Sequence, residues 1–104
     1  MARQYEVIWS VLAREDLRKV GKYIEQDSPE NARRFLIKLR NAAATIGNFP
    51  EKLPIVSELG LPYRERLVGR YRIIYRVETS RVVVLAVLHA ARDLTNALGD
   101  RIKK

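Results

Sequence analysis

The chain has 104 residues, of which 47% are hydrophobic and 31% charged, so it is long enough for one folded domain spanning residues 1–104 and too short for two. The formal net charge of +8 indicates an acidic partner, which could be a nucleic acid, an acidic protein or an anionic membrane surface. There is no cysteine, which excludes disulfides and thiolate chemistry, and one histidine is too few for a protein-only zinc site, so we expect no metal and no cofactor. The N-terminus lacks the apolar core of a signal peptide, and no apolar run is long enough to span a membrane, so we expect a cytoplasmic protein without membrane contact.

The first half of the chain predicts a strand and two helices. Residues 4–9 are β-branched and aromatic, which is typical of a strand. A helix follows from Val11. Its apolar face is formed by Ala13, Leu17, Val20 and Ile24. A second helix begins after Ser28, which is suited to cap it, and Pro29, and it ends at Gly47. Because only a short turn separates them, the two helices should form an antiparallel hairpin.

Residues 47–62 contain three prolines and two glycines and predict an irregular loop, longer than most connections in compact domains. Two interpretations stay open: a functional or partner-docking element, or a crossover that packs Phe49, Leu53 and Ile55 onto the core. Three strands and a short final helix are then predicted at residues 63–68, 71–77, 81–89 and 92–104. The third of these strands has no polar alternation, so it should be central in the sheet and covered on both faces.

The hairpin formed by the first two of these strands can adopt two registers. A two-residue turn would pair Val68 with Tyr71 and bring arginines of the first strand onto the apolar face of the second. A turn of odd length around Gly69 would instead separate basic from apolar side chains, and because burying charge costs far more than a one-residue bulge, we expect the odd turn. It places Tyr63, Leu67, Tyr71, Ile73, Tyr75 and Val77 on one face. It places Arg64, Arg66, Arg72, Ile74 and Arg76 on the other.

Arginines are concentrated in this hairpin. Residues 64–81 contain six arginines, two glutamates and no lysine, so they carry a net charge of +4 (six minus two), which is half of the total. Guanidinium groups held on a sheet present planar forks that suit phosphate or carboxylate groups. The expected arginine face would therefore meet an acidic partner. Alternatively, Arg76 and Arg81 form a solvated basic edge that blocks strand-to-strand aggregation.

Three stretches of the sequence follow one another in a specific order and spacing. They are Ala13-x-x-Asp16-Leu17 in the first helix, RLVGRYRIIYRV at residues 66–77 and VLHAARD at residues 87–93. Together they resemble the RelE/ParE superfamily of toxins from type II toxin–antitoxin systems, and the resemblance covers residues 7–94. It implies an α+β, RelE-like fold. An N-terminal strand and a helix hairpin would pack on a mainly antiparallel sheet with a three-stranded C-terminal meander and a short C-terminal helix.

The superfamily that the chain resembles divides by target. RelE-like members cut messenger RNA on the ribosome, whereas ParE-like members lack a full nuclease set and inhibit DNA gyrase. By position, Arg72 and Arg92 match two arginines of the nucleases, and His89 would be the proton donor. The nuclease tyrosine of the final helix is matched by Leu98, which cannot exchange a proton. The ending Leu-His-x-x-Arg-Asp looks more like the ParE branch, so we expect a gyrase inhibitor, with an mRNA endonuclease as the alternative.

A ParE-like toxin would act by binding its target rather than by turnover. Its electrostatic contacts would be Arg64, Arg66, Arg72 and Arg76. The resemblance implies neutralisation by a cognate antitoxin, which would lay an acidic or amphipathic helix against the groove of the helix hairpin and reach the arginine face. It leaves open a homodimer or a heterotetramer with the antitoxin. In this interpretation Arg72→Ala weakens toxicity and leaves antitoxin binding largely intact.

Several polar and aromatic positions also have a structural interpretation. His89 could form a hydrogen bond where the last strand meets the final helix instead of transferring a proton. Asp16 is expected to pair with lysines about one turn away along the first helix. Asp93 should cap the final helix or pair with the preceding arginine. Tyr71 and Tyr75 should pack in the core rather than stack on bases.

Overall fold

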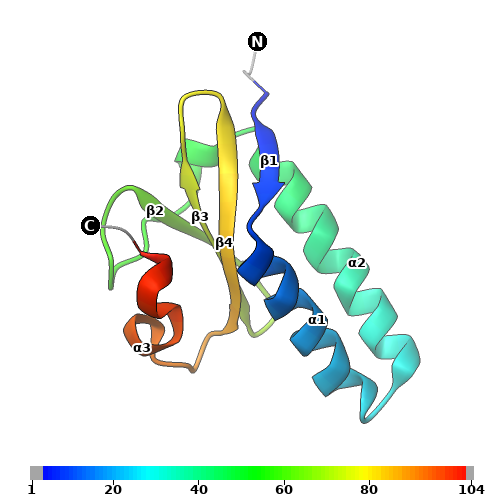
Figure 1. The fold of residues 1–104 in the computed structure, drawn as a ribbon. Coiled ribbons are helices and arrows are strands. Elements are labelled where there is room, and N and C mark those ends of the chain that lie inside the picture. Colours follow the sequence, from blue (N-terminus) through cyan, green and yellow to red (C-terminus); the bar gives the residue numbers. More distant parts are fainter. Residues whose placement is uncertain (1–3, 103–104) are drawn as a thin grey trace.

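The computed structural model describes residues 4–102, which form a helix hairpin, a four-stranded sheet and a short C-terminal helix (Figure 1). The strands are β1 (Glu6–Trp9), β2 (Tyr63–Val68), β3 (Tyr71–Val77) and β4 (Arg81–His89). The α-helices are α1 (Val11–Glu25), α2 (Pro29–Ile46) and α3 (Leu94–Leu98), and short 3-10 turns span Pro50–Lys52 and Gly99–Arg101. The α+β class and the predicted order of elements are confirmed. Within residues 4–102, no helix is long and apolar enough to cross a bilayer.

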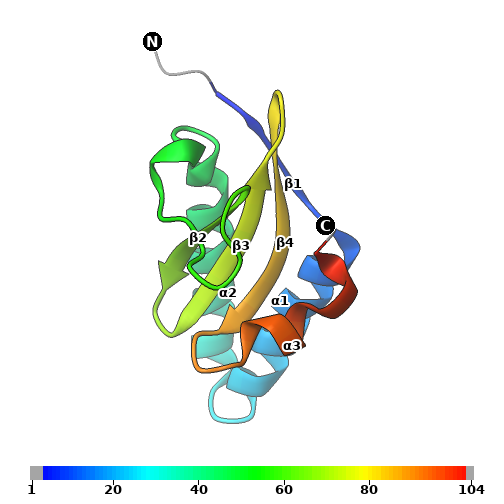
Figure 2. The ribbon, with the colours of Figure 1, turned by 90° about the vertical axis from the view of Figure 1, so that its left-hand side faces the viewer.

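The sheet has the order β1-β4-β3-β2, with β1 parallel to β4 and the other neighbours antiparallel. Because parallel neighbours cannot be joined by a tight turn, the chain reaches β4 only after the helix hairpin and the first two strands of the meander. Helices α1 and α2 lie on one face of the sheet and α3 lies on the other (Figure 1, Figure 2). Strand β4 is therefore central and covered on both faces, as its apolar sequence predicted.

Both long helices begin at serine caps. The Ser10 and Ser28 hydroxyls each accept a hydrogen bond from the backbone N–H three residues later, at 3.0 and 3.1 Å, which satisfies one free donor of each helix. Helix α2 ends at Gly47, as predicted, and packing explains the residue type. A Cβ atom at Gly47 would lie 2.5 Å from the carbonyl oxygen of Tyr5, whose N–H donates to the Gly47 carbonyl at 2.9 Å. Glycine therefore lets the chain entering β1 pass close to the end of α2.

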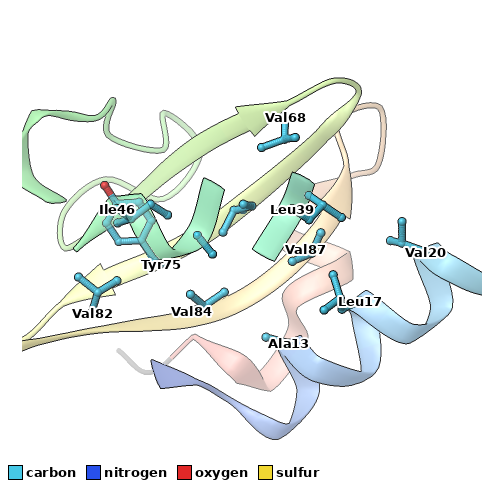
Figure 3. Close-up of a cluster of buried hydrophobic side chains, with 12 residues drawn as sticks. Ala13, Leu17, Val20, Leu39, Ile46, Val68, Tyr75, Val82, Val84 and Val87 are labelled. Atoms are coloured by element: carbon cyan, nitrogen blue, oxygen red, sulfur yellow. The ribbon is translucent and has the colours of Figure 1, made fainter. Parts of the chain in front are cut away.

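The larger core cluster fills the space between the helix hairpin and the sheet (Figure 3). Its fully enclosed members come from α1, α2 and all three strands of the meander. They are Ala13, Leu17, Val20, Leu39, Ala43, Ile46, Val68, Ile73, Tyr75, Val82, Val84 and Val87. The apolar stripe predicted for α1 is confirmed. Tyr75 packs in this core as expected, its hydroxyl donates to the carbonyl of Pro50, and burial raises the pKa of its phenol to about 12.

A second core cluster lies on the opposite face of the sheet, under α3. Its buried members are Val56, Tyr63, Ile74, Leu85, Ala86, Leu88, Leu94 and Leu98. A register shift in β4 pairs Ile74 with Ala86 and Tyr75 with Val84, which leaves Leu85 as an extra residue. Because of this bulge, Val84 and Val87 both contribute to the first cluster while Leu85 joins the second. One apolar strand thus supplies two cores.

The loop between α2 and β2 packs differently from the crossover that was predicted. Phe49 and Ile55 are 53% and 42% exposed, so the expectation that they pack onto the core is wrong. Only Leu53 of the predicted trio borders the first cluster. Val56 is the loop residue that is fully buried, and it belongs to the second cluster. The loop therefore contributes to both faces of the sheet, with Leu53 on the helix side and Val56 on the far side.

The predicted register of the β2–β3 hairpin is wrong. Val68 pairs with Tyr71, which is the two-residue turn, and Arg66 pairs with Ile73. Residues directly opposite one another share a face, so Arg66 lies on the helix side of the sheet and Arg72 on the other. Leu67, expected in the core, pairs with Arg72 and is 64% exposed. The arginines of β2 and β3 do not form a common face.

Turn geometry and ion pairing explain why this register is stable. Gly69 has a φ of +58° and no described non-glycine residue has a positive φ, which matches a two-residue turn with glycine at its first central position. The cost of bringing charge onto covered faces is reduced here because Arg64 and Arg72 each have a partner, while Arg66 stays partly exposed. Arg64 donates to the carbonyl of Leu53 at 2.7 Å. Arg72 lies between two carboxylates, so an ion pair is buried rather than a lone charge.

Candidate functional site

Arg72, the central residue of the predicted site, is hydrogen-bonded to carboxylates of the protein itself. Its Nε donates to Glu65 at 2.6 Å, and its two Nη atoms donate to the carboxylate of Glu58 at 2.8 and 2.9 Å. The residue is only 7% exposed, and these hydrogen bonds, above all those that it donates to Glu58, raise the pKa of its guanidinium further. Two neutralising carboxylates leave Arg72 poorly suited to hold a phosphate or an acidic partner.

The other three arginines of the predicted contact set do not act together either, since each has a different environment. Arg64 is tied to the loop backbone. Arg76 pairs with Glu78 at 2.9 Å, and the same carboxylate pairs with Arg81 at 2.6 Å. Arg66 alone of the four makes no ion pair or side-chain hydrogen bond within residues 4–102. The expected surface of four cooperating arginines is therefore not formed.

The three residues expected to act in a nuclease are also divided by the sheet. His89 pairs with Tyr71 on the helix side, whereas Arg72 pairs with Leu88 on the opposite side. His89 and Arg92 do lie together, in a groove at the end of the sheet. Leu98, at the position of the nuclease tyrosine, is 2% exposed and belongs to the second core cluster. Only two of the three candidate catalytic residues are thus close together.

We call the groove that contains His89 the sheet-end groove. It has a volume of about 590 Å³ and lies between α1, α2 and the ends of β3 and β4. Its lining residues are Asp16, Lys19, Val20, Tyr23, Ile24, Phe35, Arg70, Tyr71, Val87, Leu88, His89 and Arg92. Aromatic rings contact one another along its wall: Tyr71 lies 5.5 Å from Phe35 and 5.4 Å from His89 between ring centroids. Sequence reasoning missed Tyr23 and Arg70 as site residues, because Tyr23 lies outside the predicted apolar stripe and Arg70 lies in a turn.

His89 has a structural contact within this groove. Its Nδ1 accepts a hydrogen bond from the N–H of Ala91 at 3.1 Å, directly after the end of β4. With Nδ1 used as an acceptor, the ring proton of the neutral imidazole lies on Nε2. This contact is the structural one expected at the junction of strand and helix. This hydrogen bond does not test proton transfer by His89, which stays a prediction.

A second, larger groove, which we call the hairpin groove, lies between α1, α2 and β1. Its volume is about 1080 Å³. Trp9, Leu17 and Leu36 contribute apolar surface to it. Five basic residues and one acidic residue also line it: Arg14, Arg18, Lys22, Arg33, Arg40 and Glu25. It combines an apolar lining with an excess of positive charge, which is the chemistry that an acidic amphipathic helix requires.

Asp16 has a role that the sequence interpretation missed. The expected pairing with lysines along α1 is wrong. Asp16 is 6% exposed and is hydrogen-bonded to distant parts of the chain. Its Oδ2 accepts hydrogen bonds from the backbone N–H of Val87 at 3.0 Å and from Arg101 at 2.6 Å. Arg101 also donates to Asp16 Oδ1 at 3.1 Å and to the carbonyl of Leu85 at 3.2 Å. A signal was present, since Asp16 falls beside Leu17 on the buried side of the helix.

Asp93 caps the final helix, as one of its two interpretations predicted. Its Oδ1 accepts a hydrogen bond from the hydroxyl of Thr95 at 2.8 Å and another from the N–H of Asn96 at 3.5 Å. The hydrogen bond from Thr95 is the main cause that lowers the pKa of the Asp93 carboxyl. The cap turns the chain after His89 and so helps to hold the wall of the sheet-end groove.

The ion pair at Glu58 predicts an acid-sensitive contribution to stability. Hydrogen bonds from Arg72 lower the pKa of the Glu58 carboxyl from 4.5 to about 2. Because the folded pKa is the lower one, the stabilisation is complete above about pH 4.5 and is lost as the pH falls toward 2. We therefore expect wild type to be more stable than Glu58→Gln at pH 6, and this difference to disappear between pH 4.5 and 2, measured by urea denaturation. A difference that stays constant across this range would contradict the pairing.

The chain is similar to known toxins of toxin–antitoxin systems. The family model described as the ParE toxin of the type II toxin–antitoxin system parDE matches residues 7–94. Toxin RelE2 of Caulobacter vibrioides is 33% identical over 88 residues, which are 84% of this chain and 97% of that protein.

Two solved toxin–antitoxin structures are similar in fold. A chain of the chromosomal ParDE system of P. aeruginosa has a TM-score of 0.73 and 13% identity, covering 85% of this chain and 98% of its own. A chain of the RelBE2 complex of Mycobacterium tuberculosis has a TM-score of 0.62 and 28% identity, covering 86% of this chain and 94% of its own. With a family match over 88 residues and this shared fold, the chain belongs to the ParE toxin family of type II toxin–antitoxin systems.

Proposed function

We propose that this toxin inhibits DNA gyrase by binding it, without cutting RNA. The observation that carries the proposal is the state of Arg72, whose guanidinium is neutralised by Glu58 and Glu65 and faces away from His89. A ribonuclease needs cationic groups aimed at the charge that develops on the phosphate, and donors already bound to carboxylates cannot supply it. A second proton-transfer group is also missing, because the position of the nuclease tyrosine is taken by Leu98, which is buried in the core.

The alternative is a RelE-like, ribosome-dependent mRNA endonuclease. One geometric observation favours it: His89 and Arg92 line the same groove and could serve as proton donor and phosphate ligand. The name of the relative from Caulobacter, Toxin RelE2, points in the same direction. This reaction would have to proceed without Arg72, unless Glu58 and Glu65 released it on the ribosome.

We further propose that the cognate antitoxin occupies the hairpin groove. Membership of the family makes an antitoxin the expected partner, and two similar structures are of toxin–antitoxin systems. Basic side chains from both helices surround apolar surface in this groove, so an amphipathic helix with an acidic face would match it in both polarity and charge. An antitoxin in this groove would not also cover a common arginine face, because that face is not formed.

The target is tested by two assays on the purified toxin. We expect it to inhibit supercoiling by DNA gyrase and to leave mRNA intact on translating ribosomes, with toxin preincubated with the antitoxin encoded by the neighbouring gene as the control. Cleavage of mRNA in the ribosomal A site, with no effect on supercoiling, would establish the endonuclease instead. Activity in neither assay would refute both proposals.

A further inference from the structure

We infer that the sheet-end groove is the surface that grips the target, and that its occupant is an acidic protein segment carrying an apolar or aromatic side chain. The inference rests on the proposed function and adds the surface and the chemistry of the partner segment. It moves the contact away from the four arginines that the sequence predicted to Lys19, Arg70 and Arg92, which surround this groove.

The floor of the groove is apolar and can receive a large side chain. Val20, Ile24 and Val87 border it together with the rings of Phe35 and Tyr71. Tyr23 lies beside this floor and is 69% exposed, so its ring is available for contact with a partner. Aromatic residues and arginine are the side chains that most often dominate protein–protein binding energy.

The charge of the groove is positive and is not cancelled from within. Lys19, Arg70 and Arg92 are exposed, and none of them forms an ion pair with any residue in the range 4–102. Asp16 is the one carboxylate among the lining residues, and it is neutralised by Arg101. Three free cations around an apolar floor are complementary to carboxylates flanking an apolar anchor.

Ring geometry favours a protein segment over a nucleic acid. The Tyr71 ring is tilted at 51° to Phe35 and meets His89 edge to face at 76°, so these rings pack against one another rather than lie parallel. Single-stranded nucleic acid is typically held by ring faces left free for successive bases. Rings that pack against one another in this way offer one irregular apolar surface, which suits a side-chain anchor better than a stack of bases.

The two grooves lie on different sides of α1 and share no lining residue. Arg14, Arg18 and Lys22 line the hairpin groove, whereas Lys19 and Tyr23 line the sheet-end groove. The surfaces assigned to antitoxin and target can therefore be altered independently by substitution, which makes the assignment testable.

The experiment compares two double charge reversals in the purified full-length toxin. Arg70→Glu with Arg92→Glu alters the sheet-end groove, and Arg14→Glu with Arg33→Glu is the matched control in the hairpin groove. Both variants are first compared with wild type by circular dichroism and thermal unfolding. Inhibition of DNA gyrase supercoiling and affinity for the antitoxin encoded next to the toxin gene are then measured.

We expect the sheet-end variant to need at least about 10-fold more toxin for half-maximal inhibition, because opposite charges become like charges, while its antitoxin affinity stays within about 3-fold of wild type. The control should show the reverse. Tyr23→Ser, an exposed change without charge reversal, should also weaken inhibition and leave the fold intact.

Three outcomes would overturn the assignment. Undiminished inhibition by the sheet-end variant would show that the target binds elsewhere, and loss of antitoxin binding in that variant would assign the groove to the antitoxin. Binding of a labelled single-stranded oligonucleotide by wild type that the variant abolishes would make the occupant a nucleic acid. Failure of the wild-type toxin itself to inhibit gyrase is a separate result, which refutes the proposed function on which the inference rests.

Discussion

Replacing Asp16 by alanine should destabilise the protein by about 3 kcal/mol, which corresponds to a fall of roughly 15 °C in melting temperature for a domain of this size. Asp16 accepts the buried N–H of Val87 and holds both Nη atoms of Arg101. Removing it leaves a backbone donor without a partner in the core and a largely covered guanidinium without its counterion. The free energy of unfolding in urea, measured near pH 7, gives the size of the effect.

The neighbouring Glu15 provides the control. It is exposed on the same turn of α1, so Glu15→Ala should change the free energy of unfolding by no more than about 0.5 kcal/mol. Asp16→Asn should fall between the two, since an amide oxygen can still accept the N–H of Val87 but carries no charge for Arg101. If Asp16→Ala and Glu15→Ala were equally mild, the buried link between α1, β4 and the C-terminal residues would be refuted.

Replacing Arg72 by alanine should also act on stability, with a loss of about 2 to 3 kcal/mol in urea denaturation. The substitution leaves Glu65 largely covered and without its counterion, whereas the more exposed Glu58 can return to water, which moderates the cost. In the proposed binding mechanism, the folded Arg72→Ala protein inhibits gyrase as well as wild type does, once the assay temperature lies well below its melting temperature. This replaces the expectation from sequence that Arg72 contacts the target directly.

Arg66→Ala is the matched control for Arg72→Ala. It removes an arginine from the same hairpin that has no ion pair within the described residues, so its effect on the free energy of unfolding should stay within about 0.5 kcal/mol. A folded Arg72→Ala protein of unchanged stability that no longer acts would support a direct role for this guanidinium. Loss of RNA cleavage by such a variant would support the endonuclease.

The fold could be predicted from the sequence wherever the signal was local. Ser10 and Ser28 cap their helices, Gly47 ends α2, and the apolar residues of α1 face the core as their spacing indicated. The unbroken apolar run of β4 correctly placed this strand in the centre of the sheet. Each of these features depends on a few neighbouring residues and on whether a side chain prefers water, so no knowledge of distant contacts was needed.

The candidate site could be predicted only in part, because its residues depend on distant partners. An odd turn would be favoured only if arginines of β2 could not share a face with apolar residues without burying unpaired charge. The backbone carbonyl of Leu53 accepts from Arg64, and the carboxylates of Glu58 and Glu65 pair with Arg72, so these guanidinium groups are not buried as lone charges. A positive φ at Gly69 then suited the two-residue turn. His89 and Arg92 line the same groove because His89 ends β4 and Arg92 follows it three residues later, so their proximity depends on local sequence alone.

Local chemistry along the chain was thus sufficient for the helices, their caps, the succession of elements along the chain and the excess of positive charge. Packing decided which of those positive charges remain available to a partner. Helix caps and apolar stripes involve residues within one or two turns, whereas neutralising Arg72 requires Glu58 from a loop 14 residues away, and neutralising Asp16 requires Arg101, 85 residues away. A guanidinium is equally charged in either case, but its energy depends on the nearest carboxylate and on access to water, and both are set when the sheet, the loop and the C-terminal residues come together.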